Sequence, residues 1–571
     1  MWRVTSVACL SLVAAALVGA CEPPPRYDVL VRNGTLIDGT GAAPRTADLA
    51  VVADRIVAVG DLPERAEADL VLDADGLIVA PGFINMLSWA TESLIEDGRA
   101  QSDVRQGVTL EVFGEGFSMG PLNDAMKQQL VERQGDIRYD VSWTTLGEYL
   151  EFLVERGVSP NVASFVGATT VRVHEVGYDD RPPTAEELER MKQLVARAME
   201  EGALGVGSSL IYAPAFYSDT AELIELARIA AAYDGLYISH IRNEGNRLEE
   251  AVEELLEIAR EADIPAEIYH LKAAGRENWS KLERVIERIE AARADGLEIT
   301  ADIYPYTAGA TGLDAAMPPW VQEGGHDAWV ERLNDPAVRR RVAREMTTRS
   351  DAWENLFLAA GAEGMLLVDF KNEALKPLTG RTLAEVAAER GLSPEETAIE
   401  LVIEDDSRVG TIYFLMSEEN VHRKAALPWV SFGSDEAAPS AEGVFLRSNP
   451  HPRAYGTFAR AVGPFVRQHR LMPLEEAVRK LTSLPAETLG LVDRGRLAVG
   501  YKADLAIFDA ARIQDHATYA EPHQYATGMV HVLVNGVPVL RHGEHTGALP
   551  GEVVRGPGWR GDDAAPEAGT D

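Results

Sequence analysis

The sequence has almost no cysteine, and the two that it has lie near its start. Cys9 and Cys21 are the only cysteines among 571 residues. The chain after residue 21 therefore offers no disulfide, no thiolate metal ligand and no cysteine nucleophile. An oxidising compartment is compatible with such a protein.

Basic residues are scarce relative to acidic ones. The chain has 54 Lys and Arg against 90 Asp and Glu, a formal net charge of −36. This charge repels nucleic acid and anionic membrane surfaces, so we expect no nucleic-acid partner and no membrane contact other than an anchor at Cys21. The apolar content of 46% and charged content of 25% are ordinary for globular proteins. The length allows a large catalytic domain and a smaller second unit.

The first 21 residues differ in composition from the rest. Arg3 precedes a mostly apolar run over residues 4–20, and small residues lead to Cys21. This pattern is similar to a bacterial lipoprotein signal, in which a lipidated Cys21 becomes the mature N-terminus and residues 22–26 form a stiff tether. An uncleaved membrane anchor is the alternative, because about seventeen apolar residues approach the minimum bilayer span. We expect an exported, membrane-anchored lipoprotein on the periplasmic or extracytoplasmic face.

Strand-like segments occupy both ends of the remaining chain. Residues 29–37 predict a hairpin with Asn-Gly at its turn, and residues 530–537 repeat the pattern. We predict one small β-sandwich built from residues 27–80 and 490–556. An acidic tail, residues 557–571, follows.

The middle of the chain, residues 81–489, alternates helices and strands. Helical patterns over 220–234, 247–263 and 281–295 are each followed by a short apolar strand. This repetition predicts an α/β fold with a parallel sheet, most simply a (β/α)8 barrel with an insertion at about 308–376. An open doubly wound sheet is the alternative, but no Gly-rich phosphate turn follows a first strand.

Two histidines close successive strands of this pattern. His240 ends the run 236–240 and His270 ends the run 266–270, thirty residues later. That spacing matches one βαβ unit, so both imidazoles would lie at the same rim of a parallel barrel. They could be metal ligands, acid–base groups, or buried histidines with ordinary hydrogen bonds.

A carboxylate follows a later apolar strand. Asp435 comes after residues 429–432 and Gly433-Ser434. At a strand end it could accept a proton from metal-bound water and pass it to a leaving nitrogen. It could equally be a helix N-cap.

Several segments, in this order, resemble the N-acyl-D-amino-acid deacylases, or D-aminoacylases, of the amidohydrolase superfamily. The resemblance spans residues 27–555. The segments that carry it are residues 237–244, 270–275, 304–306, 433–435, 451–458 and 500–505.

The resemblance implies a distorted (β/α)8 TIM-like barrel, a small β-sandwich, and zinc that activates water against an amide. It makes His240 and His270 zinc ligands and Asp435 the proton shuttle. It also places four residues at the substrate: Lys272 and Arg453 near its carboxylate, and Tyr304 and Tyr306 in the pocket wall. Arg offers a bidentate fork to a carboxylate and Lys a point charge. The alternatives are a surface ion pair for Arg453 and a solvated face for Lys272.

Two departures from the family pattern concern the metal. The family follows Pro-Gly-Phe-Ile-Asp with His-x-His, whereas here Leu87 and Trp89 follow Pro-Gly-Phe-Ile-Asn. Neither side chain can bind zinc. Where the family has a ligand cysteine before Gly-Phe-Ser, this chain has Glu115. A carboxylate is a competent ligand, and His2Glu is a known catalytic set. A loop carboxylate without a metal is the alternative.

These observations favour a hydrolase with one zinc ion held by Glu115, His240 and His270. Its expected partner is a small N-acyl amino acid, most simply an N-acyl-D-amino acid. One alternative is a lipoprotein that binds such a conjugate without cleaving it. Another is an amidohydrolase that acts on a cyclic amide or a dipeptide.

Overall fold

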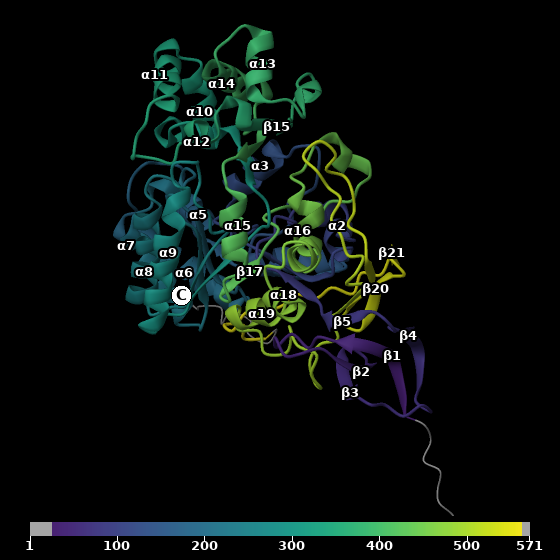
Figure 1. The fold of residues 1–571 in the computed structure, drawn as a ribbon. Helices are drawn as coiled ribbons and strands as arrows, with labels where there is room; N and C mark the ends of the chain where they lie inside the picture. The colour runs from purple at the N-terminus through teal and green to yellow at the C-terminus, as the bar shows by residue number, and fades with distance from the viewer. Residues whose placement is uncertain (1–24, 562–571) are drawn as a thin grey trace, which may run out of the picture.

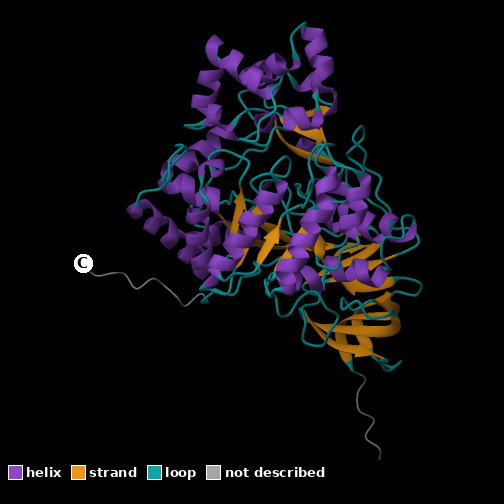
Figure 2. Ribbon diagram, turned by 60° about the vertical axis from the view of Figure 1, so that its left-hand side comes forward, coloured by secondary structure: helices purple, strands orange, loops and turns teal. Residues whose placement is uncertain are grey.

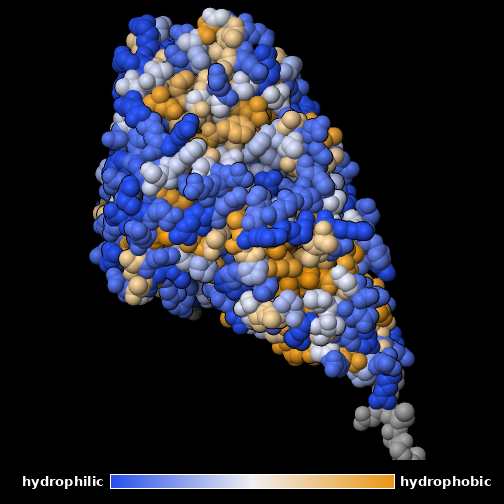
Figure 3. All heavy atoms as spheres, viewed as in Figure 1, coloured by the Kyte–Doolittle hydropathy of each residue, from blue (hydrophilic) through white to orange (hydrophobic). Residues whose placement is uncertain are grey.

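The computed structural model describes residues 25–561, which form three parts (Figure 1). A central set of strands is surrounded by helices, a mostly helical unit lies above it, and a strand-rich unit lies below (Figure 2). The face in Figure 3 is largely hydrophilic, with hydrophobic side chains in separate groups. Among residues 25–561, none of the helices combines the length and apolar character that crossing a bilayer requires.

The central strands form a distorted parallel barrel, as predicted. One sheet has the order β6-β7-β8 and a second has the order β17-β13-β12-β11-β10-β9. The stretch 161–167 carries both β8 and β9, so it joins the two sheets. On the other side, Asp435 N–H donates to the Leu87 carbonyl (2.8 Å), which links β17 to β6. The barrel strands are β6 (Phe83–Asn85), β7 (Val108–Phe113), β8 (Asn161–Ser164), β9 (Val166–Gly167), β10 (Gly205–Ser209), β11 (Leu236–His240), β12 (Ala266–Ile268), β13 (Ile299–Ile303) and β17 (Val430–Phe432).

Helices cover the barrel, and the longer ones are amphipathic and bury one apolar stripe. In α8, the apolar face formed by Val252, Leu255, Leu256 and Ala259 is buried. The helices predicted at 220–234, 247–263 and 281–295 are confirmed as α7, α8 and α9. The covering helices are α1 (Ser93–Glu96), α2 (Gln101–Val104), α3 (Asp124–Arg133), α4 (Leu146–Arg156), α5 (Ala168–Glu175), α6 (Ala185–Glu200), α7 (Thr220–Ala231), α8 (Leu248–Ala262), α9 (Leu282–Ala294), α15 (Glu418–Ala425), α16 (Arg453–Val462), α17 (Pro464–Arg467), α18 (Leu474–Leu481) and α19 (Ser483–Thr488).

The two ends of the described chain share one sheet. β5 pairs with β1 and also, antiparallel, with β18, with Val79 opposite Ile507. The hairpin predicted at 530–537 is confirmed by β19 and β20, but the one predicted at 29–37 is wrong. There β1 runs straight through, and Asn33-Gly34 lies at a register shift against β2. The strands are β1 (Arg26–Leu36), β2 (Arg45–Val52), β3 (Arg55–Gly60), β4 (Glu67–Asp73), β5 (Ile78–Pro81), β18 (Leu505–Phe508), β19 (Met529–Val534), β20 (Val537–Arg541) and β21 (Glu544–His545).

The insertion between β13 and α15 has its own apolar core and its own small sheet, in the order β14-β16-β15. It extends beyond the expected boundary at residue 376, because β16 pairs with both β14 and β15. Its elements are β14 (Ala308–Gly312), α10 (His326–Leu333), α11 (Pro336–Met346), α12 (Leu356–Ala360), β15 (Met365–Asp369), α13 (Leu383–Arg390), α14 (Pro394–Asp405) and β16 (Gly410–Phe414).

Candidate metal centre and active site

Three side chains from the ends of three barrel strands converge on one point. Glu115 follows β7, His240 ends β11, and His270 follows β12. Their ligand atoms all lie within 4.8 Å of one another. The three residues are 5%, 4% and 3% exposed. The parallel strands thus place the predicted ligand set in one buried cluster.

One oxygen of Glu115 contacts both imidazoles. Its Oε1 lies 3.0 Å from His240 Nδ1 and 2.9 Å from His270 Nε2. Burial alone would raise the pKa of Glu115, but the charges of the histidines and their hydrogen bonds hold it well below its usual range. An ionised carboxylate beside two imidazole nitrogens is a donor set that fits zinc and leaves one coordination position open.

A second carboxylate, Glu244, lies near the ring nitrogens of His240 and His270 that do not contact Glu115. Its oxygens are 3.1 Å from His270 Nδ1 and 3.5 Å from His240 Nε2. Carboxylates in this position orient metal-binding histidines and fix their tautomers. The sequence reasoning did not single out Glu244, although it lies four residues after His240 in the segment that resembles the family.

Lys272 joins the same network. Its Nζ donates to both Glu244 oxygens at 2.7 and 2.8 Å, and it lies 2.7 Å from His270 Nδ1. The positive charge of Lys272 helps to hold the pKa of Glu244 well below its usual range against the effect of burial. The structure therefore places Lys272 next to the metal-ligand cluster, in direct contact with Glu244 and His270.

Two of the site residues have left-handed backbone conformations. His270 has a φ of 35° and Asp435 a φ of 52°. Such conformations are costly for residues other than glycine and persist where neighbours hold them. At His270, the backbone N–H donates to Asp302 Oδ1 (3.0 Å), a carboxyl whose pKa is raised to about 7 by burial.

The predicted proton shuttle is paired with the predicted carboxylate binder. Asp435 Oδ2 lies 2.7 Å from Arg453 Nη1, and Arg453 Nε donates to Glu436 at 3.2 Å. Burial raises the pKa of Asp435, Arg453 opposes that rise, and the charges of Glu115 and His270 also reach this carboxyl. Asp435 thus lies within electrostatic range of the metal-ligand cluster.

The two predicted pocket tyrosines occupy different places. The Tyr304 ring centroid lies 4.5 Å from the guanidinium carbon of Arg453 and 5.6 Å from Lys272 Nζ. The Tyr306 hydroxyl donates to the Pro452 carbonyl (3.3 Å), and its ring packs on Arg460 (3.9 Å). The Tyr304 ring therefore faces Lys272 and Arg453, the two cations expected to bind the substrate carboxylate. Tyr306 instead packs against Arg460 and Pro452.

Trp89, which stands where the family pattern has a histidine, contacts the proposed ligand Glu115. Its indole N–H donates to Glu115 Oε2 at 2.9 Å, and Leu87 is fully buried. The second oxygen of Glu115 is thereby engaged by a donor that cannot bind a metal. This arrangement leaves Glu115 Oε1 alone to face the two histidines.

Comparisons with known proteins agree with this geometry. The amidohydrolase family model matches residues 139–540, more than half of the chain. The D-aminoacylase of Alcaligenes xylosoxydans xylosoxydans is 35% identical over 532 residues, covering 92% of this chain and 97% of the relative.

Two solved structures are similar over 93% of this chain and 100% of theirs. One is a D-aminoacylase studied for a binuclear metal centre with one-metal activation and second-metal attenuation (33% identity, TM-score 0.76). The other is the N-acyl-D-glutamate deacylase of Bordetella bronchiseptica, complexed with zinc and a phosphonate inhibitor (32% identity, TM-score 0.76).

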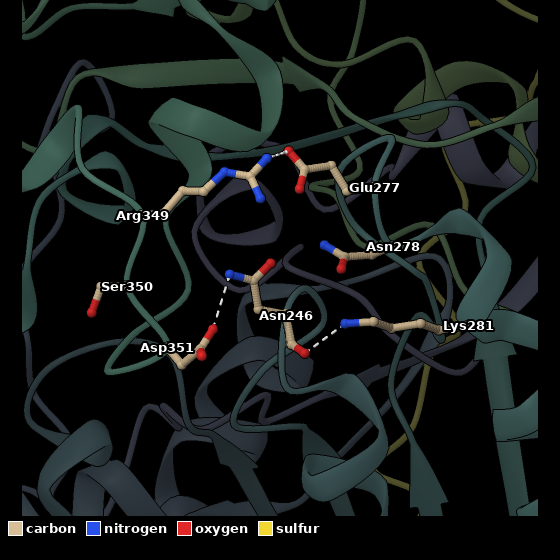
Figure 4. Close-up of a pocket in the computed structure, with 7 residues that line it drawn as sticks. All are labelled: Asn246, Glu277, Asn278, Lys281, Arg349, Ser350 and Asp351. Carbon is tan, nitrogen blue, oxygen red and sulfur yellow. Dashed lines mark hydrogen bonds and ion pairs between the residues drawn. The ribbon is translucent and has the colours of Figure 1, made fainter.

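A polar hollow of about 460 Å³ lies between the insertion and the loops after β11 and β12 (Figure 4). Asn246 Nδ2 donates to Asp351 Oδ1 across it (3.3 Å), and Arg349 pairs with Glu277. A second hollow of about 220 Å³ shares several of these residues and also has Glu354 in its wall. The insertion thus meets the barrel rim through polar contacts.

Glu354 ties the insertion to the metal-ligand network. One of its oxygens accepts from the Glu244 backbone N–H, and the other is buried without a hydrogen-bond partner among the described residues. Burial, together with the charge of Glu244, raises the pKa of Glu354 to about 8. The folded protein therefore binds a proton here that the unfolded chain releases above pH of roughly 4.3.

We expect Glu354→Gln to remove a pH-dependent loss of stability. Because the folded pKa is raised, the wild-type side chain favours folding at low pH, and this contribution is lost as pH rises towards 8. The free energy of unfolding of wild type should fall relative to that of the variant by up to about 1.4 kcal/mol per pH unit between roughly pH 5 and 8. Denaturant unfolding at several pH values measures this difference.

Glu363→Gln is the control, since Glu363 is an exposed glutamate on the same insertion. Its unfolding free energy should parallel that of wild type. Parallel pH curves for Glu354→Gln and wild type would contradict the prediction.

Proposed function

The chain belongs to the amidohydrolase family and resembles its D-aminoacylases over nearly its whole length, and from that premise we propose that it hydrolyses N-acyl-D-amino acids. The observation that carries the proposal is the convergence of Glu115, His240 and His270 on one point at the barrel rim. The relatives named D-aminoacylase and N-acyl-D-glutamate deacylase support the substrate class.

The ligand set supports one zinc ion, which Glu115, His240 and His270 would hold. When bound, zinc supplies Lewis-acid chemistry: it lowers the pKa of a water molecule and polarises the acyl carbonyl. Glu244 pairs with His270 Nδ1 at 3.1 Å and lies 3.5 Å from His240 Nε2. Leu87 and Trp89 provide no ligand for a second ion.

The remaining residues move the proton and orient the substrate. Asp435 takes a proton from the attacking water and delivers it to the leaving nitrogen as the amide C–N bond breaks. Arg453 offers its guanidinium fork to the substrate carboxylate, with Lys272 and Tyr304 nearby. Because Arg453 Nη1 lies 2.7 Å from Asp435, a carboxylate held there would place the amide beside the proton shuttle.

Two substitutions separate metal binding from proton transfer. Wild-type protein prepared without chelators should hold close to one zinc per chain, and Glu115→Ala should lose it. Asp435→Asn should keep the zinc but lower kcat by at least about a hundredfold, because it removes the general acid–base group. Metal analysis and hydrolysis of N-acetyl-D-amino acids measure both effects.

The L-enantiomers of the same substrates are the control for stereochemistry. Activity confined to them would refute the substrate class and leave the metal assignment standing. Wild-type protein that carries no metal, and cleaves no N-acyl amino acid after zinc is added, would refute the enzyme itself.

We also expect excess zinc to leave the activity of wild type unchanged, because a second ion finds no ligand at Leu87 or Trp89. The double substitution Leu87→His with Trp89→His should introduce attenuation by excess zinc. Activity and bound zinc, measured across a zinc titration, test this. Trp89→Phe is the control, since it removes the indole N–H without adding a ligand. Equal attenuation of wild type and the double variant would contradict the one-ion site.

We propose further that the protein is exported and anchored through a lipid on Cys21, which lies outside the described residues. The composition of residues 1–21 supports this, as does the proline-rich segment that follows. In cells that make the full chain, Cys21→Ser should move the protein out of the membrane fraction, measured by fractionation and immunoblotting. Cys9→Ser is the control and should leave it there. If both variants stay in the membrane fraction, the segment is an uncleaved anchor.

A further inference from the structure

The loop that carries Asp435, residues 433–436, is held by hydrogen bonds from residues at the end of β6. Asp435 has a left-handed backbone, with a φ of 52°. Its backbone N–H donates to the Leu87 carbonyl at 2.8 Å. These contacts connect the end of β17 to the end of β6, where the two barrel sheets meet.

Asn85, at the end of β6, makes the neighbouring contact with both ends of its amide. Its Oδ1 accepts from the Ser434 backbone N–H (2.8 Å), and its Nδ2 donates to Ser434 Oγ (2.8 Å). A backbone N–H can only meet an acceptor, so this contact fixes which end of the amide is oxygen. Asn85 therefore holds Ser434, the residue just before Asp435, by hydrogen bonds to its backbone and to its side chain.

The other contacts of Asn85 explain why an amide is needed there. Its Nδ2 also lies 3.2 Å from Asp103 Oδ2 and 3.0 Å from Glu111 Oε2. All three of these side chains are fully buried. Burial raises the pKa of Asp103 and of Glu111, and the two carboxyls lie close enough to repel each other when both are ionised. A hydrogen-bond donor between these two carboxyls is favourable, whereas a carboxylate at position 85 would add to their repulsion.

The sequence departs from the family pattern at this same position. The family motif is Pro-Gly-Phe-Ile-Asp, and this chain has Asn85 where the motif has Asp. The change stands two residues before Leu87, the first of the two positions that lack a metal ligand.

We propose that Asn85 is a positioning residue for Asp435: it fixes Ser434, and thereby the strained backbone that directs the proton shuttle into the site. This inference rests on the proposed function for its effect on turnover. The effect of Asn85 on the order of residues 433–436 follows from the structure alone. Displacing a catalytic group by as little as 1 Å can cost about a hundredfold in rate.

The test compares Asn85→Leu with a matched control, Asn161→Leu. Asn161 is also a fully buried asparagine at a barrel strand, but its amide contacts Thr109, Asp504 and Asn535 rather than the Asp435 loop. Asn85→Leu should lower kcat roughly ten- to a hundredfold with KM within about twofold of wild type and with the zinc content retained. Asn161→Leu should leave kcat per zinc-loaded molecule unchanged.

Hydrogen–deuterium exchange of the protein without substrate supplies the second readout. Amides of residues 433–436 should exchange at least about tenfold faster in Asn85→Leu and at the wild-type rate in Asn161→Leu, because only the first variant loses the acceptor for Ser434 N–H. Ser434→Ala keeps that acceptor and loses only the hydroxyl contact. It should therefore lower kcat less than Asn85→Leu, and it decides the matter if Asn85→Leu does not fold.

Wild-type kcat together with wild-type exchange in Asn85→Leu would overturn the inference, as would a loss of zinc that accounts for the whole drop in kcat. If Asn85→Leu does not fold, wild-type kcat in Ser434→Ala would overturn it. If wild type itself hydrolyses no N-acyl amino acid, the proposed function fails, and exchange at residues 433–436 still decides whether Asn85 holds the loop.

Discussion

The contact of one carboxylate oxygen with two imidazoles organises this molecule. Glu115 Oε1 meets His240 Nδ1 and His270 Nε2 in a nearly dry environment, where an unpaired charge would be very costly. Glu244 and Lys272 complete a set of alternating charges around the imidazoles. Because each member needs the others to remain buried, the rim strands that carry them are fixed relative to one another.

The fold could be predicted from the sequence where local patterns and strand periodicity decide it. His240, His270 and Asp435 each follow an apolar strand, and parallel strands bring such positions to one rim. The two Asn-Gly pairs show the limit of this reasoning. Asn535-Gly536 turns between β19 and β20, whereas Asn33-Gly34 lies inside β1, because β1 pairs with β2 on one side and with β4 and β5 on the other. Neighbours distant in sequence overrode the local turn preference there.

The supporting residues were harder to find because their partners come from elsewhere in the chain. Asp302 serves His270 from the next strand, and Asn85 serves Ser434 from the opposite end of the barrel sequence. Glu354 reaches Glu244 from the insertion. Asp302 and Glu354 are polar residues in an ordinary local context, and the departure of Asn85 from the family motif does not reveal its partner. Only the folded arrangement shows what each of the three residues holds. The insertion boundary was also misplaced, since β15 finds its partner β16 only after two intervening helices.

The sheet shared by the chain ends has a consequence for how the protein is made. β5 leads directly into β6, the first barrel strand, yet one edge of β5 is covered by β18, near the other end of the chain. During synthesis from the N-terminus, that edge stays open until almost the whole chain has emerged. Contacts of such long sequence separation slow folding, and an open edge invites pairing with other chains. A chain interrupted before β18 would therefore lack more than a peripheral strand: it would leave one edge of β5 exposed, and β5 is the strand that leads into the barrel.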